Sequence, residues 1–123
     1  MSLCVLAAGK MTVLAVSAFT LSWTHSVQQT EWRESWSVTP VGLHLTEAAV
    51  KGSGAGMEPG PDAILRNGWW SWSPRLPPQP SLSLAASGST TGGWRLCTAT
   101  GCITLGAVSG DDTRLSACER SAG

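Results

Sequence analysis

The chain has 123 residues, enough for one domain with a single hydrophobic core and too few for two. Its formal charge is zero and only 13% of its residues are charged, which excludes a basic surface for nucleic acid and a basic helix for a membrane surface. Seven tryptophans accompany a single phenylalanine, so indole rings supply most of the aromatic area of the core.

The first segment, residues 3–16, predicts a β-hairpin with its turn near Ala8-Gly9-Lys10, and a short amphipathic helix is the alternative. Lys10 interrupts the apolar residues, so no signal peptide is visible, although a start assigned too far downstream would give the same picture. No apolar run approaches the roughly 20 residues of a transmembrane helix, and we expect no transmembrane segment in this chain.

Three consecutive strands are predicted by alternating apolar and polar residues at positions 19–27, 32–38 and 43–50. A turn at residues 39–42 joins the second strand to the third. The apolar face of each strand is interrupted by one ionisable residue, and these are His25, Glu34 and Glu47.

Hairpin geometry predicts that these three side chains form a row. If both connections are four-residue loops, His25 lies opposite Glu34 and Glu34 lies opposite Glu47, with Cβ atoms about 5 Å apart. Two adjacent carboxylates on an apolar face raise each other's pKa, and an imidazolium beside them lowers that cost. Such a cluster is typical of a functional pocket. The alternatives are a structural pair that fixes the register and an acid–base catalytic site; no ligand-spacing motif supports a metal.

A glycine-rich stretch at residues 51–58 follows the third strand and predicts a loop whose backbone N–H groups form a nest beside the row. Pro59 and Pro61 exclude the helix that a dinucleotide fingerprint requires, and the stretch lacks the Lys-Ser/Thr ending of a P-loop. A plain glycine loop is the alternative. We assign no catalytic residue, metal or cofactor. The predicted ligand-binding residues are His25, Ser26, Glu34, Glu47, Gly52, Ser53, Gly54, Ala55, Gly56 and Met57.

The remaining residues predict further short strands separated by turns. Asn67-Gly68 is a turn signal before an aromatic strand at 69–72, whose tryptophans either pack in the core or stack a sugar or a base. An extended connection at 74–80, a strand at 81–86, a loop at 87–93 and a hairpin of 94–97 with 102–105 follow. Cys97 and Cys102 are opposed in that hairpin, which is compatible with a disulfide and an oxidising compartment.

The expected architecture is all-β: a small antiparallel β-sandwich or partly open β-barrel built from consecutive hairpins. Residues 1–108 are expected to form this single domain, and residues 109–123, which lack periodicity, a flexible C-terminal tail. The spacing pattern does not pair Cys4 or Cys118.

Four blocks in this order and spacing resemble a bacterial family, the domain of unknown function numbered 1850, over about residues 3–105. The blocks are residues 23–27 (WTHSV), 32–36 (WRESW), 47–58 (EAAVKGSGAGME) and 68–70 (GWW).

The resemblance implies a small extracytoplasmic accessory protein whose gene neighbours encode TRAP transporters with TAXI-type solute receptors. It implies a non-enzymatic role in solute uptake, with the receptor, the membrane subunits or a small organic acid as partner, in the periplasm or at the outer face of the membrane. Family members commonly begin with a signal or anchor segment, from which this chain departs. The other hypotheses are a small enzyme using His25 and the two glutamates and a purely structural or assembly domain.

Overall fold

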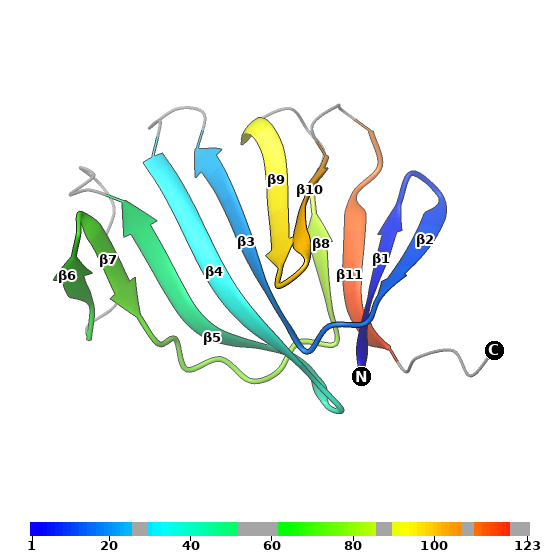
Figure 1. Ribbon diagram of the computed structural model, residues 1–123, viewed down its shortest axis with the longest axis horizontal. Coiled ribbons are helices and arrows are strands. Elements are labelled where there is room, and N and C mark those ends of the chain that lie inside the picture. The colour runs from blue at the N-terminus through cyan, green and yellow to red at the C-terminus, as the bar shows by residue number, and fades with distance from the viewer. Residues whose placement is uncertain (26–29, 52–61, 86–89, 107–109, 119–123) are drawn as a thin grey trace.

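The structure is a computed structural model that describes residues 1–25, 30–51, 62–85, 90–106 and 110–118 (Figure 1). Within these ranges every regular element is a β-strand, and no helix is present. The strands are β1 (Ser2–Ala7), β2 (Lys10–Leu14), β3 (Ala18–His25), β4 (Thr30–Thr39), β5 (Gly42–Lys51), β6 (Ile64–Arg66), β7 (Trp69–Trp72), β8 (Ser81–Leu84), β9 (Thr90–Thr98), β10 (Gly101–Leu105) and β11 (Thr113–Cys118).

Two antiparallel sheets pack as a sandwich that does not close into a barrel. This confirms the all-β prediction, and of the two predicted architectures the β-sandwich is the one observed. The smaller sheet has the order β2-β1-β11-β8 and the larger one β10-β9-β3-β4-β5-β7-β6. The face of the larger sheet that turns toward the smaller one is called the inner face below. The core between the sheets consists of Leu3, Val5, Phe19, Leu21, Trp36, Val38, Leu43, Leu45, Leu84, Leu96, Leu105 and Leu115.

The hairpins follow the predicted turn chemistry. Ala8 and Gly9 have φ values of 51° and 76°, and Asn67 and Gly68 have 53° and 82°. Positive φ at both central residues twists a two-residue turn in the sense that the flanking strands require. The turns therefore fix β1–β2 and β6–β7 as local hairpins, and the helical alternative for residues 3–16 does not occur.

The connection from β7 to β8 crosses from the larger sheet to the smaller one and is held at Gln79. Backbone hydrogen bonds of 2.7 and 2.8 Å join Gln79 to Leu43 in both directions. A Cβ atom on Gly42 would lie 2.6 Å from the carbonyl oxygen of Gln79, so only glycine allows the two backbones to approach this closely.

The prediction of a flexible C-terminal tail from residue 109 is wrong, because residues 113–118 form strand β11. β11 occupies a central position in the smaller sheet, between β1 and β8, and Leu115 is fully buried. The domain therefore extends to Cys118, which forms a disulfide with Cys4. A six-residue strand with one large apolar residue has little local signal, and its place depends on pairing with a segment more than a hundred residues away.

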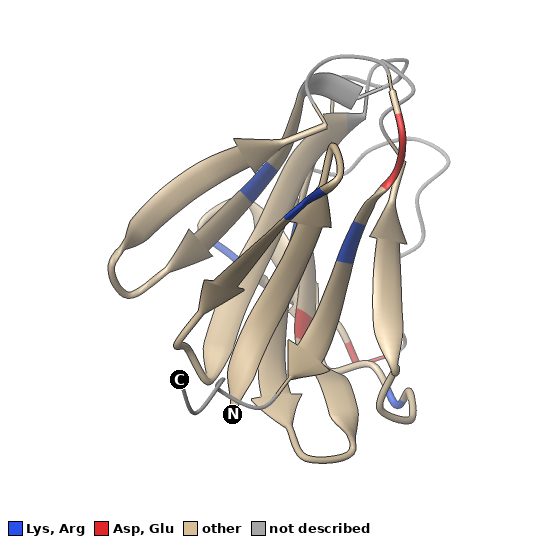
Figure 2. Cartoon of the chain, turned by 90° about the vertical axis from the view of Figure 1, so that its right-hand side faces the viewer, with Lys and Arg blue, Asp and Glu red and all other residues tan. Residues whose placement is uncertain are grey.

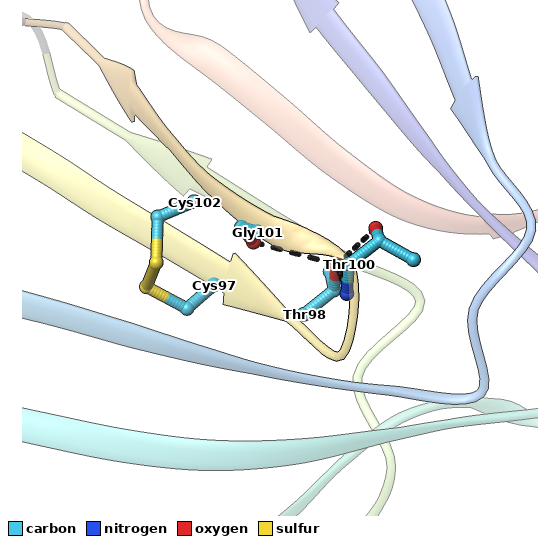
Figure 3. The surroundings of a disulfide bond; sticks show 5 residues. All are labelled: Cys97, Thr98, Thr100, Gly101 and Cys102. Carbon is cyan, nitrogen blue, oxygen red and sulfur yellow. Dashed lines mark hydrogen bonds between the residues drawn. A yellow bond between two sulfur atoms is a disulfide. The ribbon is translucent and has the colours of Figure 1, made fainter.

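The predicted 94–97/102–105 hairpin is present, with β9 and β10 extending it, although β9 begins at Thr90 within the expected 87–93 loop. Cys97 lies opposite Cys102, and the structure joins them in the expected disulfide (Figure 3). At the turn, the backbone N–H of Thr100 donates a 3.2 Å hydrogen bond to the hydroxyl of Thr98. Two disulfides thus use all four cysteines.

Candidate functional site

The register of β3 against β4 differs from the prediction by four residues. Leu21, not His25, lies opposite Glu34, and His25 pairs with Thr30. The observed register opposes Trp23 to Trp32 and Phe19 to Trp36, with ring centroids 6.2 and 6.4 Å apart.

Two stacked cross-strand aromatic pairs favour this register over the predicted one, which would form a single pair. A shift by an even number of residues keeps every side chain on its expected face. For the described side chains of β3 and β4 the faces were therefore predicted correctly, but the partners were not.

A β-bulge separates the two glutamates. Trp36 pairs with Leu45 as predicted, but Ser35 pairs with Glu47, so Thr46 is one extra residue in β5. The hydroxyl of Thr46 donates a 3.0 Å hydrogen bond to the carbonyl oxygen of Ser35. Beyond the bulge Ala48 and Val50 take the buried inner positions, and Glu47 is exposed on the outer face.

The predicted row of His25, Glu34 and Glu47 therefore does not form. Of the two glutamates only Glu34 lies on the inner face, where it is opposite Leu21 and Ala48. His25 is placed only through its backbone, four residues along β3 from Leu21 or about 13 Å. Its side chain, Ser26 and the glycine-rich residues Gly52, Ser53, Gly54, Ala55, Gly56 and Met57 lie outside the described residues, so their predicted roles stay predictions.

Four tryptophans form a continuous row beside Glu34, and we call Trp23, Trp32, Trp72 and Trp94 the tryptophan face. Trp23 is stacked on Trp32 and lies 4.7 Å from Trp94, centroid to centroid, and Trp32 meets Trp72 edge to face at 6.4 Å. These distances are typical of favourable ring pairs. The indole N–H of Trp94 donates a 3.0 Å hydrogen bond to the carbonyl oxygen of Ala85, which ties the end of the row to the chain leaving β8.

Burial along the inner face of β4 is lowest at Trp32 and Glu34, between buried Thr30 and buried Trp36. Trp36 is 5% exposed because the smaller sheet covers it, whereas Glu34 and Trp32 are only half-buried. In Figure 1, β5, β7 and β6 lie at the opposite end of the molecule from β1 and β2. Within the tryptophan face, Trp23 and Trp94 pack partly against the core, and all four rings stay half-buried.

The carboxyl group of Glu34 is held in an apolar setting. Burial among tryptophan, leucine and alanine raises its pKa above the ordinary 4.5, and the hydrogen bond from the indole of Trp36 opposes part of that shift. Within the described part of the chain no basic side chain contacts this carboxylate. The site therefore presents half-buried rings together with one acid for which the described residues supply no counter-charge.

A polar depression of about 450 Å³ includes Glu47 on the outer face. Its lining includes Glu47, Asp62, Ser71 and Arg75. Nearby on this face the guanidinium of Arg33 lies 4.2 Å from the ring centroid of Trp69. In the view of Figure 2, blue and red segments lie apart from one another, some on strands and others on connections.

No three potential metal ligands of the His, Cys, Asp or Glu type gather among the described residues. The tryptophan row itself was missed by the sequence analysis, which placed Trp23 and Trp32 on the correct face but paired them otherwise. The available signal was the pair of WxxxW-like spacings, 19–23 and 32–36, which permits two aromatic pairs at once.

Fold and site together define a small disulfide-linked β-sandwich whose inner face carries a row of half-buried tryptophans. The family model described as domain of unknown function (DUF1850) matches residues 19–105. The chain belongs to this family. Comparison with the curated proteins and with the solved structures gives no match. Among the described residues no helix has the length and apolar character needed to cross a membrane.

Proposed function

We propose that this protein is a non-catalytic binding module and that the tryptophan face around Glu34 is its contact surface. The observation that carries the proposal is the contiguous row of four half-buried indole rings on the inner face of the larger sheet. Tryptophan combines large apolar area with one polar edge, which is why it dominates binding surfaces.

We further propose that the module serves a TRAP-type uptake system and engages its TAXI-type solute receptor or its membrane subunits. The sequence resemblance described above supports this role. An extracytoplasmic location is supported by the pairing of all four cysteines, because such bonds persist in oxidising compartments.

A catalytic role for the two glutamates is not favoured by their positions. A general acid and base must both reach one substrate, and the bulge at Thr46 places Glu34 and Glu47 on opposite faces of the sheet.

The test is isothermal titration of the purified protein with a purified TAXI-type receptor. Trp32→Leu on the inner face should weaken the complex at least about tenfold, as loss of a central aromatic contact does. Trp69→Leu is the matched control, because it removes the same ring from the outer face of the same sheet. Equal effects of the two variants, or no complex with the wild-type protein, would refute the proposal.

A further inference from the structure

The charge on the tryptophan face is not balanced within the described chain. The residues that face Glu34 from the neighbouring strands are Leu21 and Ala48, neither of which titrates. The described lysine and arginine side chains of the larger sheet near Glu34 point elsewhere. Arg33 lies over Trp69 on the outer face. Lys51 is exposed on the outer face, opposite Trp69. Arg95 is also exposed on the outer face, opposite Ser22.

On the outer face of the same sheet, the chain itself supplies a cation that packs on a tryptophan ring. There the Arg33 guanidinium sits 4.2 Å from the centroid of the Trp69 ring, within the roughly 6 Å over which a ring quadrupole attracts a positive charge. On the inner face the rings are more numerous and a carboxylate accompanies them, but no described residue provides the cation.

From this contrast we infer that the tryptophan face binds a small organic cation of the alkylammonium class, with the Glu34 carboxylate as its counter-charge. The inference rests on the proposed binding function and names its ligand. Trp32 is two residues from Glu34 on β4, so their side chains leave the same face about 7 Å apart. Trp72 shares that face across Ala48.

Charge distinguishes an organic cation from two other possible ligand classes, organic acids and neutral apolar molecules. An organic acid would bring a second negative charge to a half-buried carboxylate, which is unfavourable. A neutral apolar ligand would remove more water from Glu34 without replacing it by a partner. A cation with an apolar shell covers the indole faces and pairs with the acid at the same time.

The experiment compares choline chloride with 3,3-dimethylbutan-1-ol, which has the same shape without the charge, and with sodium succinate as the organic acid. Binding is measured by titration calorimetry and by tryptophan fluorescence at constant ionic strength. Choline should bind saturably and at least about tenfold more tightly than the alcohol or succinate, as expected for a cation–π site completed by a carboxylate.

Glu34→Gln should weaken choline binding about tenfold, since it removes the charge while keeping an acceptor for the Trp36 indole. Glu47→Gln makes the same charge change on the outer face and should leave the affinity unaltered. Trp32→Leu provides a second variant that removes a ring instead of the charge.

Equal binding of choline and the neutral alcohol, unchanged affinity in Glu34→Gln, or absence of saturable choline binding would overturn the inference. Succinate binding in place of choline would overturn it while leaving a binding module in place. The receptor titration described above reports separately on that proposed function, so the two failures are distinguishable.

Discussion

The indole Nε1 of Trp36 donates a 3.1 Å hydrogen bond to Oε1 of Glu34, two residues earlier on the same strand. One end of this bond is a core residue that is 5% exposed, and the other is the half-buried acid of the tryptophan face. The bond therefore orients the carboxyl group from the core side. It also satisfies the indole N–H, which would otherwise be buried without a partner.

The raised pKa of Glu34 should make the stability of the protein depend on pH. Burial raises the pKa of Glu34 above the ordinary 4.5, so the folded state prefers the neutral acid. Its contribution to stability is fully present below the unfolded-state pKa and is lost as the pH rises through the higher folded-state pKa. Glu34→Gln should be more stable than wild type at pH 7, and the two should converge below about pH 4. Urea unfolding across this range measures the difference, and a constant difference at every pH would contradict the assignment.

The Trp36 hydrogen bond should lower the pKa of Glu34, although less than burial raises it. Trp36→Phe removes the donor and keeps a large ring, so the pKa should rise further, and stability should fall by about 1–3 kcal/mol. Carboxyl carbon NMR titration of Glu34 measures the pKa. The control is Trp94→Phe, which loses the hydrogen bond to Ala85 and should leave the Glu34 pKa unchanged.

The two disulfides should differ in their effect on stability. Cys4 and Cys118 are 114 residues apart in sequence, and Cys97 and Cys102 only 5. Loop entropy predicts a loss of about 5 kcal/mol on removing the first bond and about 2 kcal/mol on removing the second. Double Cys→Ser variants compared by urea unfolding test this order. A larger loss from the short bond would contradict the chain-entropy account.

Because Gly42 lies close to the backbone of Gln79, its substitution by alanine should reduce stability more than the same substitution at Gly101. Gly42 and Gly101 have φ values of +130° and +144°, but only at Gly42 would a Cβ meet backbone, at 2.6 Å. Gly101→Ala should cost about 1 kcal/mol from backbone strain alone, and Gly42→Ala about 2–4 kcal/mol because the Leu43–Gln79 pairing must also shift. Equal losses would show that the close approach does not matter.

The bulge residue Thr46 should be removable without turning either glutamate to the other face. Deleting Thr46 joins Leu45 directly to Glu47, which keeps Glu47 opposite Ser35 on the outer face and Val50 on the inner face. Because only the hydrogen bond to Ser35 is lost, we expect a cost of about 1 kcal/mol, and a loss above about 3 kcal/mol would show that a charged group had replaced a buried apolar one. Thr46→Val keeps the residue count, loses only the hydrogen bond to Ser35, and should cost about 1 kcal/mol. Urea unfolding of both variants measures the two losses.

Much of the fold follows from local signals. Alternation along β3 and β4 places Trp23, Trp32 and Glu34 on one face, and Ala8-Gly9 and Asn67-Gly68 select hairpin turns. The bulge also has a local signal, because Thr46 and Glu47 are two polar residues in succession after the alternation of Leu43 and Leu45. Unbroken alternation of faces along the strand ignores this bulge, and for that reason it predicts Glu47 beside Glu34.

The residues by themselves determine that this chain is all-β, which side chains share a face up to each irregularity, and where the tight turns lie, because these properties depend on backbone alternation and on single turn residues. Only the tertiary structure decides that Trp23 stacks on Trp32, that Leu21 faces Glu34, and that β11 completes the smaller sheet. Registers that differ by an even number of residues bury the same faces, so the choice among them falls to contacts between strands that no local pattern encodes.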